Sequence, residues 1–343
     1  MDEPATSIRS GSASARSRSN RANDSGFVLD IAGLPVLVRA SDDEHLAVVR
    51  AVFGDSALSP DAPRAEIAYG PGTLAVPDRE PDEQFPDLDV WRDGEVLHLA
   101  SGFHGVQARV TPVAAEIVAS GAVRDRGFRR IFQPAITHML AHYGIFVIHA
   151  ASMRRGELGV LALGETGKGK STIALAALQH GWRVMGDDLV ALWLVDDGAM
   201  IRGLPKPMAL PSDLGDAPDP DGNERAGSPS PVEGARRLEW DHRRRLHVPT
   251  EQLDLEPVRL GAILLVEHGD SDRSSVAPLA GSAITSWLMG SYTSVANAPL
   301  MRRFFPVAIA AARVPGWIVH HGTDSATRLS DAARILDEVS TGW

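Results

Sequence analysis

Cysteine is absent from this 343-residue chain, and lysine is almost absent. Without cysteine the protein has no disulfide, no thiolate nucleophile and no Cys-ligated zinc or iron–sulfur cluster. Three of the 34 basic residues are lysine, namely Lys168, Lys170 and Lys206, and the other 31 are arginine. Two of these lysines are separated by a single residue. Because the chain uses arginine almost everywhere else, we infer that it needs the ammonium group of lysine at this place.

Net positive charge and long apolar runs are also missing. The formal net charge is −10 and the isoelectric point is near 5.6, which argues against a main role in binding nucleic acid or an anionic membrane. No apolar run approaches the roughly 18 residues that span a bilayer, and the N-terminus lacks the apolar segment of a secretory signal. We therefore expect a cytoplasmic protein that binds neither nucleic acid nor a membrane.

The composition changes along the chain in three steps. Residues 1–25 contain seven serines and four arginines with almost nothing apolar, which predicts a disordered tail. Residues 26–120 carry short alternating runs with hairpin signals at Gly33-Leu34 and Asp93-Gly94. They predict a β-rich N-terminal domain with substrate recognition as its role. Residues 121–343 alternate helical patterns with buried apolar runs, and they predict a catalytic α/β domain.

Several elements of this second part have clear sequence patterns. The apolar runs 145–152 and 158–164 predict adjacent buried strands joined by a turn at 154–157. Later patterns predict a helix over 282–290 and another over 297–314, the second interrupted at Pro306.

The most specific motif in the chain is a phosphate-binding loop of the Walker A type. Residues 164–171 read GETGKGKS and fit the pattern G-x-x-x-x-G-K-[ST] at every fixed position, between an apolar strand and an amphipathic helix. Glycines allow backbone N–H groups to turn toward phosphate oxygens, and the helix adds its positive N-terminal end. Lys170 is expected to reach the β- and γ-phosphates of ATP, and the Ser171 hydroxyl to ligate Mg²⁺. The residues predicted to bind the nucleotide are Gly164, Glu165, Thr166, Gly167, Lys168, Gly169, Lys170, Ser171 and Thr172.

An acidic pair follows the helix. The apolar run 182–185 predicts a strand parallel to the one before the phosphate loop, so that Asp187 and Asp188 arrive at the same sheet edge as the loop. One carboxylate can hold Mg²⁺ while the other accepts the proton of an attacking hydroxyl group, which favours a kinase over a simple NTPase. The alternative is an ordinary Asp-rich turn. His149 interrupts an apolar strand upstream, where a histidine of the core is the alternative to a site residue.

The segment from Ile148 to Leu192 places a His-containing strand, a phosphate loop, a helix and an Asp-Asp pair in one order. In this order of elements the segment resembles the catalytic core of the HPr kinase/phosphorylase family. The resemblance implies an α/β fold, the phosphoenolpyruvate-carboxykinase-like P-loop fold, with a mixed sheet flanked by helices. It implies that Asp187 is the catalytic base, that Asp188 ligates metal, and that His149 lies near the phosphates together with Lys170. It also points to a homo-oligomer.

The chain departs from this family after the acidic pair. The Glu-x-Arg-Gly-x-Gly signature, which is linked to phosphorolysis and to HPr docking, is missing. A stretch rich in Pro and Gly, residues 211–235, predicts a flexible loop or lid there. In this respect the chain is more similar to HPr-kinase-related proteins that phosphorylate the C-terminal serine of a lasso-peptide precursor. Of Arg243, Arg244 and Arg245, at most two can face a phosphate or a peptide carboxylate from one strand, and a solvated basic face is the alternative.

The sequence therefore predicts an ATP- and Mg²⁺-dependent kinase that acts on a serine hydroxyl of a peptide or protein in lasso-peptide biosynthesis. Three alternatives stay open. They are an HPr-type protein serine kinase, a kinase for free serine, and a nucleotide-gated binding module that uses ATP to order the 211–235 loop.

Overall fold

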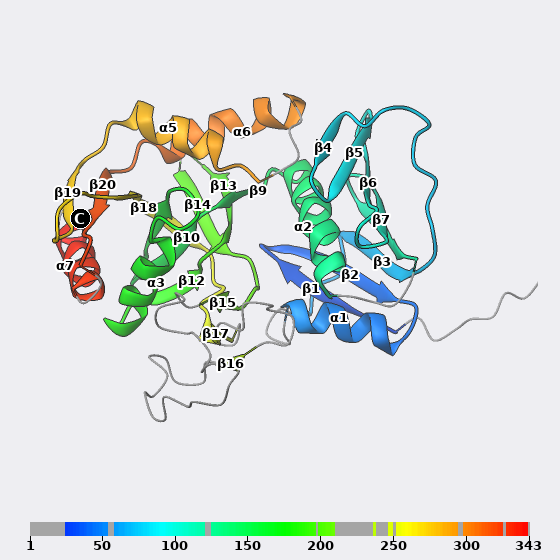
Figure 1. Ribbon diagram of the computed structural model, residues 1–343, viewed down its shortest axis with the longest axis horizontal. Coiled ribbons are helices and arrows are strands. Elements are labelled where there is room, and N and C mark those ends of the chain that lie inside the picture. Colours follow the sequence, from blue (N-terminus) through cyan, green and yellow to red (C-terminus); the bar gives the residue numbers. More distant parts are fainter. Residues whose placement is uncertain are drawn as a thin grey trace, which may run out of the picture.

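The computed structural model describes residues 25–53, 58–120, 125–196, 198–209, 236–237, 246–249, 252–293, 298–324 and 327–341. The predicted tail up to residue 24, the 211–235 loop and the run Arg243-Arg244-Arg245 lie outside these residues. Figure 1 shows two groups of strands at opposite ends of the molecule, each covered by helices. The chain is a mixed α/β protein, as the sequence predicts.

The first sheet has eight strands in the order β1-β2-β3-β8-β7-β6-β5-β4. Its neighbours run antiparallel except for the parallel pairs β2/β3 and β3/β8. Both predicted hairpins are confirmed, because the chain turns at Ala32-Gly33 and at Gly94 with positive φ angles. The strands are β1 (Ser25–Ile31), β2 (Leu34–Ala40), β3 (Ala65–Pro71), β4 (Glu83–Phe85), β5 (Leu88–Asp93), β6 (Val96–Ser101), β7 (Val106–Val110) and β8 (Ala114–Ala119). Helix α1 (Asp43–Phe53) forms the crossover between β2 and β3.

Helix α2 (Asp125–His142) packs on the first sheet although it follows it in the chain. Its apolar face, with Ile131, Ala135 and Met139, belongs to the same buried cluster as strand residues such as Leu97. Gly144, at φ 79°, lies just after the helix, in the left-handed conformation that commonly ends helices. Helix α2 therefore completes the core of the N-terminal sheet.

The second sheet has nine strands and carries the phosphate loop. The main order is β12-β10-β11-β18-β14-β13-β9, with β20 beside β18 and β19 beside β20. The pairs β11/β18 and β18/β20 are parallel. Its strands are β9 (Phe146–His149), β10 (Ala151–Arg155), β11 (Leu158–Leu163), β12 (Arg183–Gly186), β13 (Leu189–Val195), β14 (Gly198–Gly203), β18 (Val258–His268), β19 (Ser275–Pro278) and β20 (Gly316–His321). A small third sheet contains β15 (Met208–Ala209), β17 (Leu246–Val248) and β16 (Arg236–Arg237).

Helices cover both faces of the second sheet, as Figure 1 shows. On one face lie α3 (Lys170–Gln179) and α7 (Arg328–Ser340), and on the other α5 (Gly281–Gly290) and α6 (Ala298–Ala311). The residues of β11 alternate between the two cores, so that Val160 and Ala162 face the first pair of helices and Leu161 and Leu163 the second. This burial on both faces explains why the sequence of β11 is a continuous apolar run.

Two predicted elements differ from the structure. The run 145–152 is divided at Ala150 between β9, which pairs with β13, and β10, which pairs with β11. Helix α6 is not interrupted at Pro306. Pro306 lies on the exposed side of the helix, where water can satisfy the carbonyl group that loses its N–H partner.

Among the residues that the structure describes, no helix combines the length and the apolar character needed to cross a lipid bilayer.

Candidate active site

The phosphate loop leaves β11 at Leu163 and enters α3 at Lys170. Two of its glycines are required by close contacts and by positive φ angles. A Cβ atom on Gly164 would lie 2.4 Å from the carbonyl oxygen of Val266, and one on Gly169 would lie 2.3 Å from the ring of His321. Gly169 is also the N-cap of α3, at φ 107°, and it supplies no side-chain cap. The first N–H groups of α3 are therefore available for an anion.

Lys170 folds back over the start of the loop. Its ammonium Nζ donates to the carbonyl oxygens of Gly164 at 2.8 Å and Glu165 at 2.9 Å, and only 5% of the residue is exposed. Burial lowers the pKa of the Lys170 ammonium, while the carboxylates of Asp188 and Asp187 oppose this change. A phosphate group bound here would place a negative charge next to the positively charged, buried ammonium.

The acidic pair reaches the loop from a neighbouring strand. Strand β10 runs antiparallel to both β11 and β12, so β11 and β12 point the same way, with β10 between them. Their carboxyl ends thus share one edge of the sheet. At that edge the Ser171 hydroxyl donates to Oδ2 of Asp187 at 3.3 Å.

Asp188 lies between a histidine and a lysine. Nδ1 of His149, at the end of β9, is 2.9 Å from Oδ1 of Asp188 and 3.1 Å from its carbonyl oxygen, while Oδ2 pairs with the ammonium of Lys206. Burial alone would raise the pKa of Asp188, but Lys206 and His149 outweigh it and hold the pKa far below its usual range. Because Nδ1 of His149 faces two oxygen acceptors, it carries the proton. Nε2 is then an acceptor, buried and without a partner among the described residues.

The donor set fits Mg²⁺ bound with a nucleotide. Mg²⁺ in such sites takes one or two protein oxygens and completes its shell with water and phosphate oxygens. Ser171 and Asp187 supply one hydroxyl and one carboxylate next to the N-terminus of α3. In the part of the chain that the structure describes, no group of three or more His, Asp or Glu side chains forms an all-protein metal site. Ser171 and Asp187 are therefore the residues that would hold the ion.

Two residues of the site were not predicted as site residues from the sequence. Lys206 follows β14 and pairs with Asp188, and its only sequence signal is the rarity of lysine. His321, at the end of β20, contacts the loop, and its Nε2 lies 3.4 Å from the carbonyl oxygen of Gly169. Burial lowers the pKa of His321 to about 4, so the ring is neutral near pH 7. No local pattern could indicate this contact.

The remaining predicted residues occupy different places. Thr166 and Gly167 are exposed on the loop, Lys168 is half-buried beside them, and Thr172 is buried in the first turn of α3. The predicted arginines, Arg243, Arg244 and Arg245, fall outside the described residues, so the structure does not place them.

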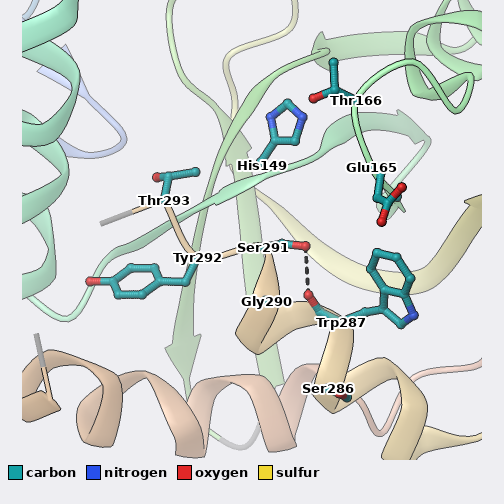
Figure 2. A pocket seen from close by; sticks show the side chains of 10 residues that line it. His149, Glu165, Thr166, Ser286, Trp287, Gly290, Ser291, Tyr292 and Thr293 are labelled. Atoms are coloured by element: carbon teal, nitrogen blue, oxygen red, sulfur yellow. Dashed lines mark hydrogen bonds between the residues drawn. The ribbon is translucent and has the colours of Figure 1, made fainter. Parts of the chain in front are cut away.

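A pocket of about 460 Å³ opens beside this site, and Figure 2 shows its two walls. One wall comes from the end of β9 and the start of the phosphate loop. The other comes from the last turn of α5 and the segment after it. The lining residues are His149, Gly164, Glu165, Thr166, Ser286, Trp287, Gly290, Ser291, Tyr292 and Thr293.

No family model matches the chain, and no curated protein matches it. Among solved structures, the chain is similar to the HPr(Ser) kinase/phosphatase from Coxiella burnetii, with 11% sequence identity and a TM-score of 0.27 over 57% of this chain and 99% of that one. That solved structure is named as an HPr kinase, and residues 148–192 of the present chain resemble the HPr kinase/phosphorylase family. At this TM-score the likeness carries no argument about the site, whose chemistry has to follow from its own residues.

Proposed function

We propose that the chain is an ATP- and Mg²⁺-dependent kinase that transfers a phosphoryl group to a serine hydroxyl of a cytoplasmic peptide or protein. The fold of its catalytic part would be the phosphoenolpyruvate-carboxykinase-like P-loop fold. The observation that supports this function is that three pairs of contacting groups lie near the start of α3. They are Lys170 with the loop carbonyls, Ser171 with Asp187, and Asp188 with His149.

Phosphate binding is assigned to the loop backbone and to Lys170. The N–H groups at the start of α3 would bind the phosphates, and the Lys170 ammonium, which lies over Gly164 and Glu165, would supply positive charge to them. Bound Mg²⁺ would neutralise charge on the same phosphates. These fixed donors and positive charges would lower the barrier because the transition state carries negative charge on the transferring oxygens.

The contacts favour a division of roles that differs from the one that the resemblance implies. Asp187 is next to Ser171 and suits Mg²⁺, whereas Asp188 is engaged by His149 and Lys206. In our proposal the serine oxygen forms a bond to the γ-phosphorus while the bond from that phosphorus to the bridging oxygen of ADP breaks. The hydroxyl proton passes to Nε2 of His149, and Asp188 stabilises the resulting imidazolium through Nδ1.

The narrower acceptor that we propose, on the sequence resemblance, is the C-terminal serine of a lasso-peptide precursor. A peptide that ends in serine should gain one phosphate in the mass spectrum when it is incubated with the protein, ATP and Mg²⁺. The same peptide ending in alanine should gain none, and free serine should be a much poorer acceptor. Equal rates with free serine would contradict a peptide acceptor.

Variants test the assignment of roles. Asp188→Asn and His149→Gln should each lower kcat by roughly 100-fold or more with little change in ATP affinity, since general acid–base groups contribute about that much. Asp187→Asn should instead raise the Mg²⁺ concentration required for activity. Lys170→Ala should weaken ATP binding itself. Stoichiometric ATP binding without transfer to any serine peptide would overturn the kinase and favour the nucleotide-gated module.

A further inference from the structure

The pocket beside His149 lies at the terminal-phosphate end of the phosphate loop. Gly164 and Glu165, whose carbonyl oxygens hold the Lys170 ammonium, both line it. Because this ammonium would bind the β- and γ-phosphates in the proposed function, these phosphates would lie next to the pocket. The described residues that line it include none of the 167–172 segment, along which the rest of a nucleotide would extend. The pocket is therefore on the side from which an acceptor approaches.

The wall opposite the loop offers an aromatic ring and hydrogen-bond acceptors. Trp287, in the last turn of α5, is half-buried and lines the pocket, as Figure 2 shows. The Ser291 hydroxyl donates to the carbonyl oxygen of Trp287 at 2.8 Å, and the Thr293 hydroxyl donates to that of Val147 at 3.0 Å. Since each hydroxyl hydrogen is already used within the protein, both oxygens can only accept hydrogen bonds from a ligand.

The described residues that line the pocket include an acidic side chain but no lysine or arginine. Glu165 is exposed and contributes a carboxylate, and the only other ionisable groups among the described lining residues are His149 and the phenol of Tyr292. A bound nucleotide would add the negative charge of its γ-phosphate at the same edge. A carboxylate or a second phosphate in the pocket would thus be repelled, whereas a cation could pair with Glu165 and lie on the face of Trp287.

We propose that this pocket binds a basic side chain, a lysine or an arginine, that neighbours the acceptor serine in the peptide substrate. The proposal rests on the proposed function and adds a substrate class to it, namely serine peptides with a basic neighbour. Glu165 supplies the charge, Trp287 the ring, and the Ser291 and Thr293 oxygens the acceptors for the N–H groups.

The test uses the full-length protein with ATP, Mg²⁺ and three pools of serine peptides that differ only at the neighbours of the serine. The neighbours are arginine in one pool, glutamine in the second and glutamate in the third. We expect kcat/KM to fall in this order. Glu165→Gln and Trp287→Leu should each reduce the arginine-to-glutamine ratio by roughly two- to fivefold, the size of one exposed ion pair or cation–π contact.

A matched control is available at the other end of β11. Glu157 is exposed in the turn before β11, at the opposite end from the phosphate loop, and Glu157→Gln should keep the wild-type ratio. The Glu165 side chain is exposed, so Glu165→Gln keeps the test valid if Trp287→Leu fails to fold.

The outcomes separate this proposal from the proposed function. Phosphorylation of all three pools at equal rates, or a ratio unchanged in Glu165→Gln, would overturn the basic-neighbour proposal and leave the kinase standing. A Trp287→Leu protein with weaker ATP binding and an unchanged peptide ratio would show that the pocket holds the nucleoside, which also overturns it. Absence of phosphate transfer to any pool, with ATP still bound, would overturn the kinase and this proposal together.

Discussion

Gly169 is the residue of the phosphate loop with the least space for a side chain. A Cβ atom would meet the His321 ring, and the φ angle of 107° already disfavours any residue other than glycine. We expect Gly169→Ala to displace the loop and to weaken ATP binding at least tenfold, as measured by calorimetry. Gly144→Ala is the control, because Gly144 also has a positive φ angle but open space around it. That variant should lose about 1 kcal/mol of stability and bind ATP normally. Normal binding by Gly169→Ala would contradict the importance of this contact.

Lys206 is the second residue whose role can be tested by substitution. It balances the charge of Asp188 opposite His149, and both side chains of this ion pair are about one-third exposed. Without Lys206, Oδ2 of Asp188 loses its ion-pair partner, so the carboxylate would be held less firmly against Nδ1 of His149 and would orient the imidazole less well. Lys206→Met should lower kcat by tenfold or more with an unchanged KM for ATP, and Lys206→Arg should restore part of the loss. Steady-state kinetics of the two variants is the measurement, and a wild-type kcat in Lys206→Met would exclude this role.

At the scale of single elements, α7 is tied to the sheet by one buried carboxylate. Asp331 is 1% exposed, accepts the backbone N–H of Ser274 at 2.8 Å and forms an ion pair with the Arg273 guanidinium. Asp331→Asn should cost about 2 kcal/mol of unfolding free energy, as measured in urea. On the same helix, Asp337 pairs with Arg155 at the surface, and Asp337→Asn should cost less than about 1 kcal/mol. Equal costs would contradict the special role of Asp331.

The same carboxylate predicts a pH dependence. The hydrogen bonds from Arg273 lower the pKa of Asp331 below its usual value, with burial opposing and the Ser274 N–H assisting. The folded protein thus prefers the ionised form more than the unfolded chain does. Its contribution is complete above the unfolded pKa of about 4 and is lost as the pH falls through the folded pKa. The difference between wild type and Asp331→Asn should therefore shrink below about pH 4 in urea titrations. A stability difference between wild type and Asp331→Asn that stays constant with pH would contradict the lowered pKa of Asp331.

Most single elements could be predicted because their patterns are local. Alternation and turn residues mark the hairpin at Gly94, and the glycine pattern marks the phosphate loop. The division of 145–152 at Ala150 could not be predicted, because it depends on which distant strands pair with each half. Pro306 was misjudged for a related reason, since only the packing of α6 places the proline on an exposed side.

At the scale of the whole molecule, the two sheets share a core and an ion pair. Leu189 and Leu204, from the second sheet and the segment after it, belong to the buried cluster of the first sheet. Arg202 in β14 is 8% exposed and donates from Nη1 to both carboxylate oxygens of Asp30 in β1, at 3.0 and 2.9 Å. The two sheets are therefore expected to stabilise one another.

Removing this ion pair tests that expectation. Arg202→Ala should lower the free energy of unfolding by about 2 to 3 kcal/mol, because a largely buried charge pair loses one partner. Arg39→Ala is the control, since the Arg39–Glu66 pair is 43% and 45% exposed and should contribute less than about 1 kcal/mol. Urea unfolding followed by circular dichroism measures both. Similar losses in the two variants would indicate that the contact between the sheets contributes little.

The sequence by itself determined the α/β class, the Walker A pattern of residues 164–171 and the presence of an acidic pair after it, because each depends on residues that are close together in the chain. The tertiary structure decided which partners those residues have. Lys206 lies 18 residues from Asp188, and His321 lies 152 residues from Gly169, so only the folding of β14 and β20 brings them to the site. It also decided that Asp187 faces Ser171 while Asp188 faces His149, because neighbouring residues at a strand end point in different directions.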